Sequence, residues 1–283
     1  MATAAQQLAL AASSPQPGQP PLPPHETAFA SEAASRYLAA NNGDAAKALA
    51  ALRATLAWRR AAVPPPPALP RCAACARDPE SHCIMCVGLL DDGRPIVYLS
   101  PPRARDLGTA SCTAHLTSEL EAAFALPGAA AAAVWLVDLR GFSLLQSGMN
   151  PGLGISYARL LSAHYPERLS QLVLATPPGY WTLFLGAVLP FLDARTAAKI
   201  VTLGSAAAVT EWLDKHAGAP PPPTACGGEE GAGAPSLAPT PAAGVGGPRS
   251  VGEWLRQAVS MPPLPGSLPP CLPPGAPMPV SMR

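Results

Sequence analysis

The sequence predicts an α/β protein with a mostly parallel β-sheet, and three stretches carry this prediction. Residues 134–139 form an almost continuous apolar run, which is typical of a central parallel strand. Residues 172–175 are a second apolar run, and Pro177 and Pro178 follow it as they would follow a buried strand. Residues 155–163 separate the two runs and have the pattern of a helix, so strands alternate with helices along the chain.

The composition indicates a folded middle between two tails. The chain has 283 residues, of which 48% are hydrophobic, and its 38 prolines and 24 glycines are concentrated outside the middle. We therefore expect disordered tails over residues 1–25 and 217–283, because such segments cannot bury enough apolar surface to offset the loss of chain entropy. Within the second tail, residues 250–259 indicate one short helix that either docks back on the fold or binds a partner protein.

Charge and hydropathy exclude several classes of protein. The net charge of +1 gives no reason to expect a nucleic-acid partner. No run of about 18 apolar residues is present, so no membrane span is predicted. The first residues lack the basic region and long apolar core of a secretory signal, and we expect a cytoplasmic protein.

Residues 26–63 predict a small N-terminal helical region. Leu49, Leu52 and Leu56 are spaced to lie on one helix face, and Asp44 is placed to cap the helix that carries them. Gly43 separates this helix from the preceding one, because glycine interrupts helices readily.

Residues 64–92 form a linker rich in proline and cysteine, which begins with a stiff run of four prolines. Two Cys-x-x-Cys pairs follow, with a spacing that suits a small zinc knuckle. The predicted ligands are four thiolates, with His82 as an alternative ligand: Cys72, Cys75, Cys83 and Cys86. The competing interpretation is that these thiols are small packing groups or redox-idle, since buried cysteine behaves as a small hydrophobe.

The main domain is expected over residues 93–216. A turn at residues 91–95 leads into a strand over 96–99, and residues 111–126 form a helix with Leu116, Leu120 and Phe124 on one face. Beyond the strand at 172–175, a helix over 180–189 is apolar on all sides except for Thr182. Such a helix must be covered by protein, lipid or a ligand, and its bulky side chains cannot all point inward. A short strand before Gly204 and a helix over 206–215 complete the domain.

Four motifs resemble those of the CRAL-TRIO lipid-binding family. They are His-Tyr-Pro-Glu-Arg-Leu at 164–169, Pro-Phe-Leu-Asp at 190–193, Thr-x-x-Lys-Ile at 196–200 and Asp-Leu-Arg-Gly-Phe-Ser at 138–143. The resemblance covers roughly residues 30–205. It implies a small helical region before a mostly parallel sheet, with helices on one side of the sheet and a hydrophobic lipid cavity on the other. It also implies that Cys83 and Cys86 enter the first strand of the sheet.

The resemblance further implies two sets of lipid-contacting residues. The helix over 180–189 would be a gate over the cavity, and the gate and cavity residues are Tyr180, Trp181, Phe184, Leu185, Val188 and Phe191. The lipid head group would lie near Ser143, Tyr165, Glu167, Arg168 and Lys199. From the residues themselves, the simpler interpretation of Glu167 and Arg168 is a salt bridge at the C-terminal end of a helix that fixes the turn. Asn41 and Asn42 replace a basic cluster of the family, which speaks against strong recognition of a phosphoinositide.

The functional hypothesis is non-catalytic binding, and transfer between membranes, of a phospholipid or a phosphatidylinositol-like lipid. Ser143 lacks the Gly-x-Ser-x-Gly context of a nucleophile, and the five histidines are scattered, so no enzyme is predicted. The lipid would be the only ligand apart from zinc, and contact with a membrane surface would be transient and peripheral. The alternative is an interaction scaffold with a degenerate lipid domain, which binds protein partners through its Pro-rich tails.

Overall fold

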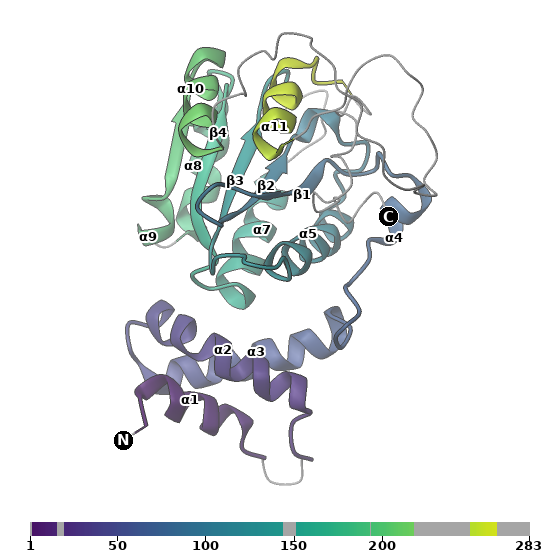
Figure 1. Cartoon of the computed structure of the whole chain (residues 1–283). Coiled ribbons are helices and arrows are strands. Elements are labelled where there is room, and N and C mark those ends of the chain that lie inside the picture. The colour runs from purple at the N-terminus through teal and green to yellow at the C-terminus, as the bar shows by residue number, and fades with distance from the viewer. Residues whose placement is uncertain (1, 16–19, 144–150, 193, 218–249, 265–283) are drawn as a thin grey trace, which may run out of the picture.

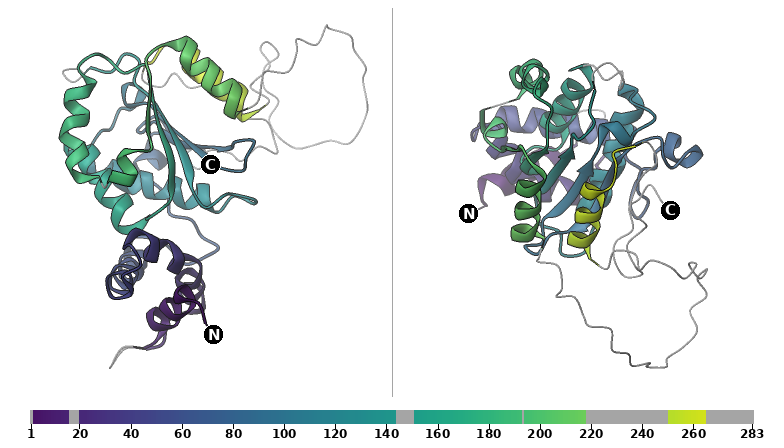
Figure 2. Two further views of the ribbon diagram at one scale, coloured as in Figure 1. Left: turned by 90° about the vertical axis from the view of Figure 1, so that its left-hand side faces the viewer. Right: turned by 90° about the horizontal axis from the view of Figure 1, so that it is seen from above.

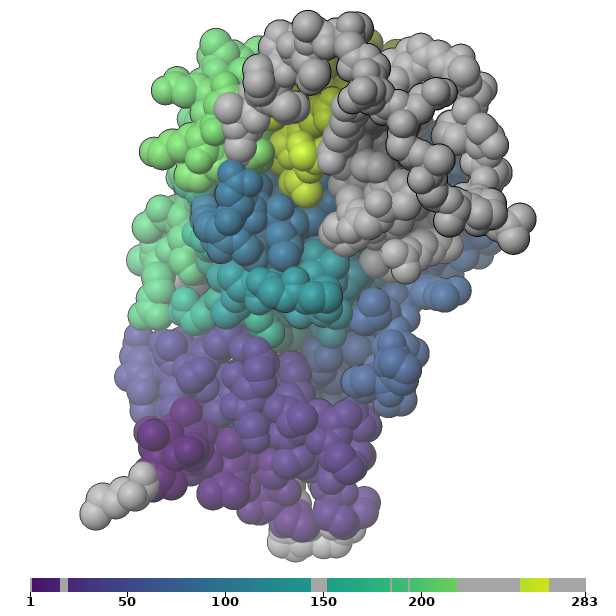
Figure 3. Space-filling view, in the orientation of Figure 1, coloured from purple at the N-terminus to yellow at the C-terminus, as the bar shows by residue number. Residues whose placement is uncertain are grey.

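The computed structural model describes residues 2–15, 20–143, 151–192, 194–217 and 250–264. A helical lobe at the N-terminal end lies against an α/β domain (Figure 1), and the space-filling view shows the two in contact (Figure 3). The lobe consists of α1 (Ala4–Ser13), α2 (Pro24–Ala40) and α3 (Ala45–Ala62). The predicted cap of α3 is confirmed, because the Asp44 side chain accepts a hydrogen bond from the Lys47 amide, and Gly43 adopts a φ of 82° between the helices.

The predicted disordered tail over residues 1–25 is wrong, because the ten residues of α1 lie within it. A capping box begins this helix: the Thr3 hydroxyl accepts from the Gln6 amide, and the Gln6 side chain accepts from the Thr3 amide. Leu8, Ala9 and Ala12 are buried against alanines of α2, whose small side chains let the helices approach closely. The helix is therefore held by packing within the lobe as well as by its own cap.

The α/β domain is built on one five-stranded sheet, in the order β1-β2-β3-β4-β5. The strands are β1 (Ile84–Leu89), β2 (Pro95–Leu99), β3 (Ala133–Asp138), β4 (Leu169–Ala175) and β5 (Ile200–Leu203). β1 pairs with β2 in antiparallel fashion, and the other three pairings are parallel. The strands predicted in the main domain are thus confirmed. The predicted linker over 64–92 is too long, because β1 already belongs to the sheet.

Helices cover both faces of the sheet. α5 (Thr109–Phe124), α7 (Pro151–His164) and α8 (Trp181–Val188) lie on one face. α10 (Ala206–His216) and α11 (Val251–Ser260) lie side by side on the other, as Figures 1 and 2 show. The expectation of helices on one side and a cavity on the other is therefore wrong, because the cavity described below shares its side of the sheet with α7 and α8. The remaining short helices are α4 (Ala73–Arg77), η1 (Pro101–Arg103), η2 (Leu189–Phe191) and α9 (Ala194–Ala197).

α11 corrects the predicted disordered tail over residues 217–283 and confirms that the short helix docks back on the fold. The Ser250 hydroxyl caps it, and Trp254 is buried with its ring edge-on to the ring of Tyr98 in β2. The carbonyl of Ala258 near its C-terminal end accepts hydrogen bonds from Arg103 (2.8 Å) and Arg140 (2.9 Å). Because cations stabilise the C-terminal end of a helix dipole, these arginines fasten the end of α11 to the sheet.

Two further predictions concern the C-terminal tail and membrane-spanning helices. The rest of the predicted C-terminal tail, 218–249 and 265–283, lies outside the described residues, and so does the proposal of partners bound there. Among the helices that the structure describes, none is both long enough and apolar enough to cross a bilayer.

Candidate functional site

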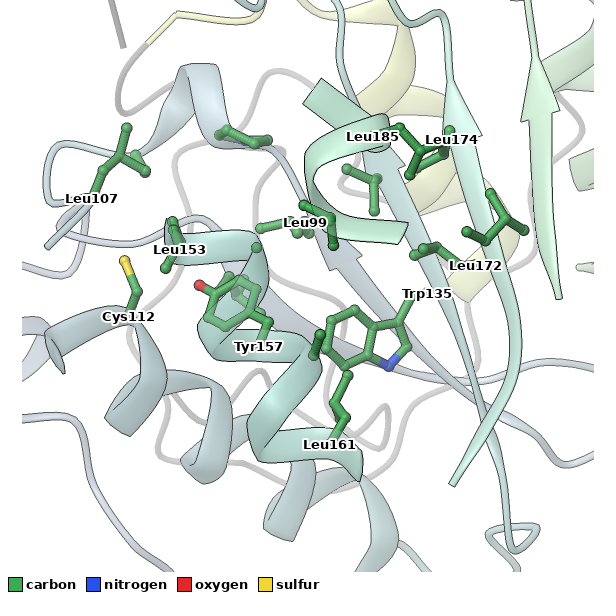
Figure 4. A pocket seen from close by; sticks show the side chains of 18 of the residues that line it. Leu99, Leu107, Cys112, Trp135, Leu153, Tyr157, Leu161, Leu172, Leu174 and Leu185 are labelled. Atoms are coloured by element: carbon green, nitrogen blue, oxygen red, sulfur yellow. The ribbon is translucent and has the colours of Figure 1, made fainter. Parts of the chain in front are cut away.

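An apolar cavity lies between the sheet and the helices α7 and α8. Its floor is formed by β2, β3, β4 and β5 through Leu99, Trp135, Leu172, Leu174 and Ile200. Its walls are formed by Leu153, Tyr157 and Leu161 of α7 and by Trp181, Leu185 and Val188 of α8. Figure 4 shows Trp135 reaching in from the sheet and Tyr157 from α7. The site is therefore enclosed by one helix–sheet layer of the domain.

The polar groups that reach the cavity are few and mostly uncharged. Burial raises the pKa of the Cys112 thiol to about 11, and burial also holds the pKa of the Tyr157 hydroxyl above its ordinary range. Both groups therefore stay neutral at physiological pH. Charge enters only at one end, where His82 and Asp106 belong to the lining. Such walls suit an aliphatic ligand and disfavour a charged one.

The free space inside the cavity is about 140 Å³. This is smaller than the roughly 300 Å³ at the lower end of ordinary small-molecule pockets. A ligand with long acyl chains requires more room than this, and the short helix α8 is one part of the wall whose outer side is exposed.

The register of α8 decides which apolar side chains face the cavity. Trp181, Leu185 and Val188 are spaced at i, i+4 and i+7 and line it, with Trp181 only 7% exposed. Leu183 points the other way and is 78% exposed. Some bulky side chains of this helix were expected to remain exposed outside the cavity. Leu183 is the most exposed of them, whereas Leu185 lines the cavity. The helix backbone includes Phe184, but its side chain lies outside the described part of the structure.

The two ends of α8 add to its apolar outer surface. Tyr180, Leu189 and Phe191 are each about two-fifths exposed, at 37%, 37% and 42%. The Tyr180 hydroxyl donates to the carbonyl of Phe142, which follows β3, so this end of the helix is tied to the sheet. Phe191, predicted among the gate and cavity residues, does not line the cavity and instead borders the polar pocket described next.

A second, polar pocket of about 580 Å³ adjoins the cavity and shares Leu161, Leu169 and Thr196 with its lining. Glu167 and Lys199 lie in it, 3.6 Å apart between carboxylate oxygen and ammonium nitrogen. Arg195, which sequence reasoning missed, pairs with Glu167 at 2.9 Å. Glu167 has a positive φ of 57°, an uncommon conformation that the tight turn from α7 to β4 imposes. The signal for Arg195 was its place in the 190–200 motif.

The other three predicted head-group residues are placed differently. Tyr165 borders the polar pocket, but its hydroxyl donates to Glu121 of α5 at 2.8 Å. Arg168 pairs with Glu32 of α2 at 3.0 Å and stacks on the Phe124 ring. It therefore joins the helical lobe to the domain, and the predicted Glu167–Arg168 salt bridge is absent among the described ion pairs. Ser143 follows β3 and is part of neither pocket lining.

The predicted four-cysteine zinc site is wrong. Cys83 and Cys86 precede and enter β1 at an odd spacing, so their side chains point to opposite faces of the sheet. Cys83 packs in the core beneath α10 and α11, whereas Cys86 packs in the core beneath α5. The interpretation of this second pair as small hydrophobes at the start of a strand is confirmed.

A model of the CRAL/TRIO domain matches residues 81–228, and the chain belongs to this family of proteins. The match begins just before β1 and takes in α8, the cavity and most of the polar pocket, whose lining also includes Ala40 and Asn42.

The chain is also similar to individual proteins. The phosphatidylinositol transfer protein PDR17 of Saccharomyces cerevisiae is 28% identical over 177 residues, which cover 59% of this chain and 50% of that protein. The CRAL-TRIO domain-containing protein C23B6.04c of Schizosaccharomyces pombe is 33% identical over 117 residues, which cover 40% of this chain and 11% of that protein. The chain thus spans half or less of these relatives. The crystal structure of Sfh5 superposes with a TM-score of 0.54 over 75% of this chain and 85% of that one, at 13% identity, and supports the fold.

Proposed function

We propose that this protein binds the acyl chains of a phospholipid in the cavity beneath α8 and exchanges the lipid with membranes. The apolar lining carries the proposal, because it offers neutral walls on every side from β2 to β5, α7 and α8. Burial of acyl chains contributes about 0.8 kcal/mol per methylene group. Membership of the CRAL/TRIO family and the similarity to a phosphatidylinositol transfer protein support the same proposal.

Exchange requires α8 to move outward, because the closed cavity is too small for a phospholipid. The helix has eight residues and no side-chain cap at its N-terminus, and Pro177 to Gly179 precede it. A short helix of this kind is held mainly by packing, here by Trp181, Leu185 and Val188. Its exposed face, led by Leu183, gives a membrane an apolar surface to receive. Membrane contact in this proposal is peripheral and transient.

The polar pocket is the proposed place of the lipid head group. Lys199 donates to the carbonyl of Leu169 at 2.7 Å, and Arg195 lies across Glu167 from it. A lipid phosphate near Lys199 and Arg195 would replace the Glu167 carboxylate as the anion that pairs with these two cations. We therefore assign phosphate recognition to Lys199 and Arg195. The salt bridge of Arg168 with Glu32 argues against Arg168, and the position of Ser143 outside the pocket lining argues against Ser143.

The test is a transfer assay between donor and acceptor vesicles of phosphatidylcholine that carry a fluorescent phosphatidylcholine or phosphatidylinositol. Leu183→Asp is expected to slow transfer of both lipids about tenfold or more, because a charge at a membrane-inserting position costs a few kcal/mol. The matched control is Thr210→Asp, which places the same charge on exposed α10, across the sheet from α8. It is expected to transfer at the normal rate.

The same assay tests the head-group pocket. The double variant Lys199→Ala/Arg195→Ala is expected to reduce transfer of phosphatidylinositol or phosphatidylcholine. Its urea unfolding midpoint is expected to change little, since both side chains are partly exposed. Normal transfer by the folded Leu183→Asp variant would refute the role of α8. Normal transfer by the double variant would refute only the head-group assignment.

The proposed function is non-catalytic. Among the described residues, the Ser111 hydroxyl lies 3.1 Å from the Nε2 atom of His82. A carboxylate oxygen of Asp106 lies 3.4 Å from this same Nε2 atom. In a serine nucleophile triad the carboxylate instead holds the opposite nitrogen of the imidazole. This arrangement orients a histidine ring and does not activate a serine.

A further inference from the structure

Four side chains with metal-binding atoms converge beside the cavity. Cys72 and Cys75 lie at the start of and within α4, His82 lies just before β1, and His115 lies on α5. Their sulfur and nitrogen atoms are all within 4.8 Å of one another. Cys75, His82 and His115 are buried, and Cys72 is half-buried. The fold thus brings together two groups from the linker and two from the domain.

The distances agree with one shared metal ion. The Nδ1 atom of His82 is 3.5 Å from the sulfur of Cys72 and 3.3 Å from that of Cys75, and the Nδ1 atom of His115 is 3.6 Å from the sulfur of Cys75. In a tetrahedral zinc site, bond lengths of about 2.3 Å to sulfur and 2.0–2.1 Å to nitrogen place a sulfur and a nitrogen roughly 3.5 Å apart. The three sulfur–nitrogen distances given above already match this length, and all other pairs lie within 4.8 Å.

The outer nitrogen of each histidine is held by an oxygen. The Nε2 atom of His115 lies 2.7 Å from the carbonyl oxygen of Ile84. The Nε2 atom of His82 lies 3.1 Å from the Ser111 hydroxyl and 3.4 Å from an Asp106 carboxylate oxygen. When Nε2 donates to these oxygens, the lone pair of each Nδ1 atom faces the two sulfurs. Partners of this kind on the far side of the ring are a regular feature of histidines that bind zinc.

We propose that Cys72, Cys75, His82 and His115 bind one structural Zn²⁺ ion. Two thiolates and two imidazoles are a common zinc donor set, and four protein ligands complete a tetrahedron without an open position for substrate. The ion would join α4 to β1 and α5, and so fix the linker against the edge of the sheet. His82 and Asp106 also line the lipid cavity, so the metal would stabilise one end of that cavity as well.

The test uses the full chain, purified under reducing conditions, stripped of metal with a chelator and titrated with Zn²⁺ or Co²⁺. One equivalent of zinc is expected to bind and raise the melting temperature. Cobalt is expected to give the visible absorption of a tetrahedral ion, with charge-transfer absorption from two thiolates. Cys72→Ser and His115→Asn are expected to weaken binding at least a hundredfold, and Asp106→Asn about 10–100-fold.

The matched controls are Cys83→Ala and Cys86→Ala, which change the other Cys-x-x-Cys pair and are expected to keep one equivalent of metal. Equal loss of metal in these controls would overturn the assignment, and so would cobalt absorption from four thiolates. Failure of the folded wild-type chain to bind either ion would also overturn it, as would a Cys72–Cys75 disulfide under the reducing conditions. Because Cys72 is half-buried, its serine variant should fold, and circular dichroism checks this. Lipid transfer is not part of the readout, so this proposal and the proposed function fail separately.

Discussion

His164 lies at the contact between the helical lobe and the α/β domain. Its ring stacks in parallel on that of Trp58 in α3, with centroids 4.1 Å apart, and its Nδ1 atom is 3.0 Å from the Thr55 hydroxyl. Burial lowers the pKa of His164 below its ordinary value of 6.5, because desolvation disfavours the charged ring. A residue of the sequence motif therefore acts here as a neutral aromatic surface between the two parts of the molecule.

This pKa predicts a pH dependence of stability. The folded protein binds a proton at His164 more weakly than the unfolded chain does, so its contribution is complete above pH 6.5 and is lost as the pH falls through the lowered pKa. The free energy of unfolding of wild type, measured by urea titration, should fall between pH 7.5 and pH 5. His164→Phe keeps the stacking and should show a shallower fall. The difference in unfolding free energy between wild type and His164→Phe at pH 8 measures the cost of the lost hydrogen bond. If the unfolding free energy of both proteins falls equally between pH 7.5 and pH 5, the prediction is contradicted.

At this scale, the sequence identified the helix that covers the cavity and two residues of the polar pocket, Glu167 and Lys199, but not which side of the helix faces inward. An apolar helix has no polar face to fix its rotation, so Leu183 and Leu185 were indistinguishable until the sheet showed which side was covered. The same limit applies to the metal ligands. Cys72 and Cys75 were evident from their spacing, whereas His115 lies on a different element and carries no local signal.

At the scale of elements, α11 depends on one close approach to α10. A Cβ atom at Gly252 would lie 2.2 Å from the carbonyl oxygen of Ala217, which follows α10. Only glycine allows this contact, which brings Trp254 and Leu255 onto the sheet.

Gly252→Ala is therefore expected to destabilise the protein by about 1–3 kcal/mol, although alanine favours helix formation. The control is Gly186→Ala in α8, where no atom lies within 4 Å of the new Cβ. It should leave stability unchanged or raise it by up to about 1 kcal/mol. Urea unfolding of both variants checks the pair, and a neutral Gly252→Ala would show that α11 is not docked in this way.

The helix that the prediction missed, α1, lies next to a Pro-rich stretch, and a composition average over such a stretch hides a helix of ten residues. The signal was local, because Thr3 and Gln6 form a capping box. The helix α11 also lies next to Pro-rich stretches, and its presence was predicted. By contrast, β3 and β4 were evident because buried parallel strands are apolar without interruption.

At the scale of the whole molecule, packing is unequal across the domain. Every residue of β3 is buried, and β2 and β4 flank it on both sides. α8 covers the cavity with one face and exposes the other. We expect amide hydrogen exchange in α8 to be at least about tenfold faster than in β3 in the absence of lipid, because local opening is cheapest where burial is least. Hydrogen exchange measured by mass spectrometry tests this prediction. If the amides of α8 and β3 exchange at equal rates, α8 belongs to the rigid core of the domain.

The placement of α11 also determines when the fold can be completed. One face of the sheet, with Met85, Tyr98 and Leu136, is covered by a helix that is synthesised long after β1, β2 and β3. Until Trp254 has left the ribosome, this apolar face has no complete cover, and contacts between such distant segments form slowly. The helical lobe, whose contacts are local in sequence, can assemble first. We therefore expect the nascent α/β domain to expose this apolar face, and to be prone to aggregation, until the last described helix has been synthesised.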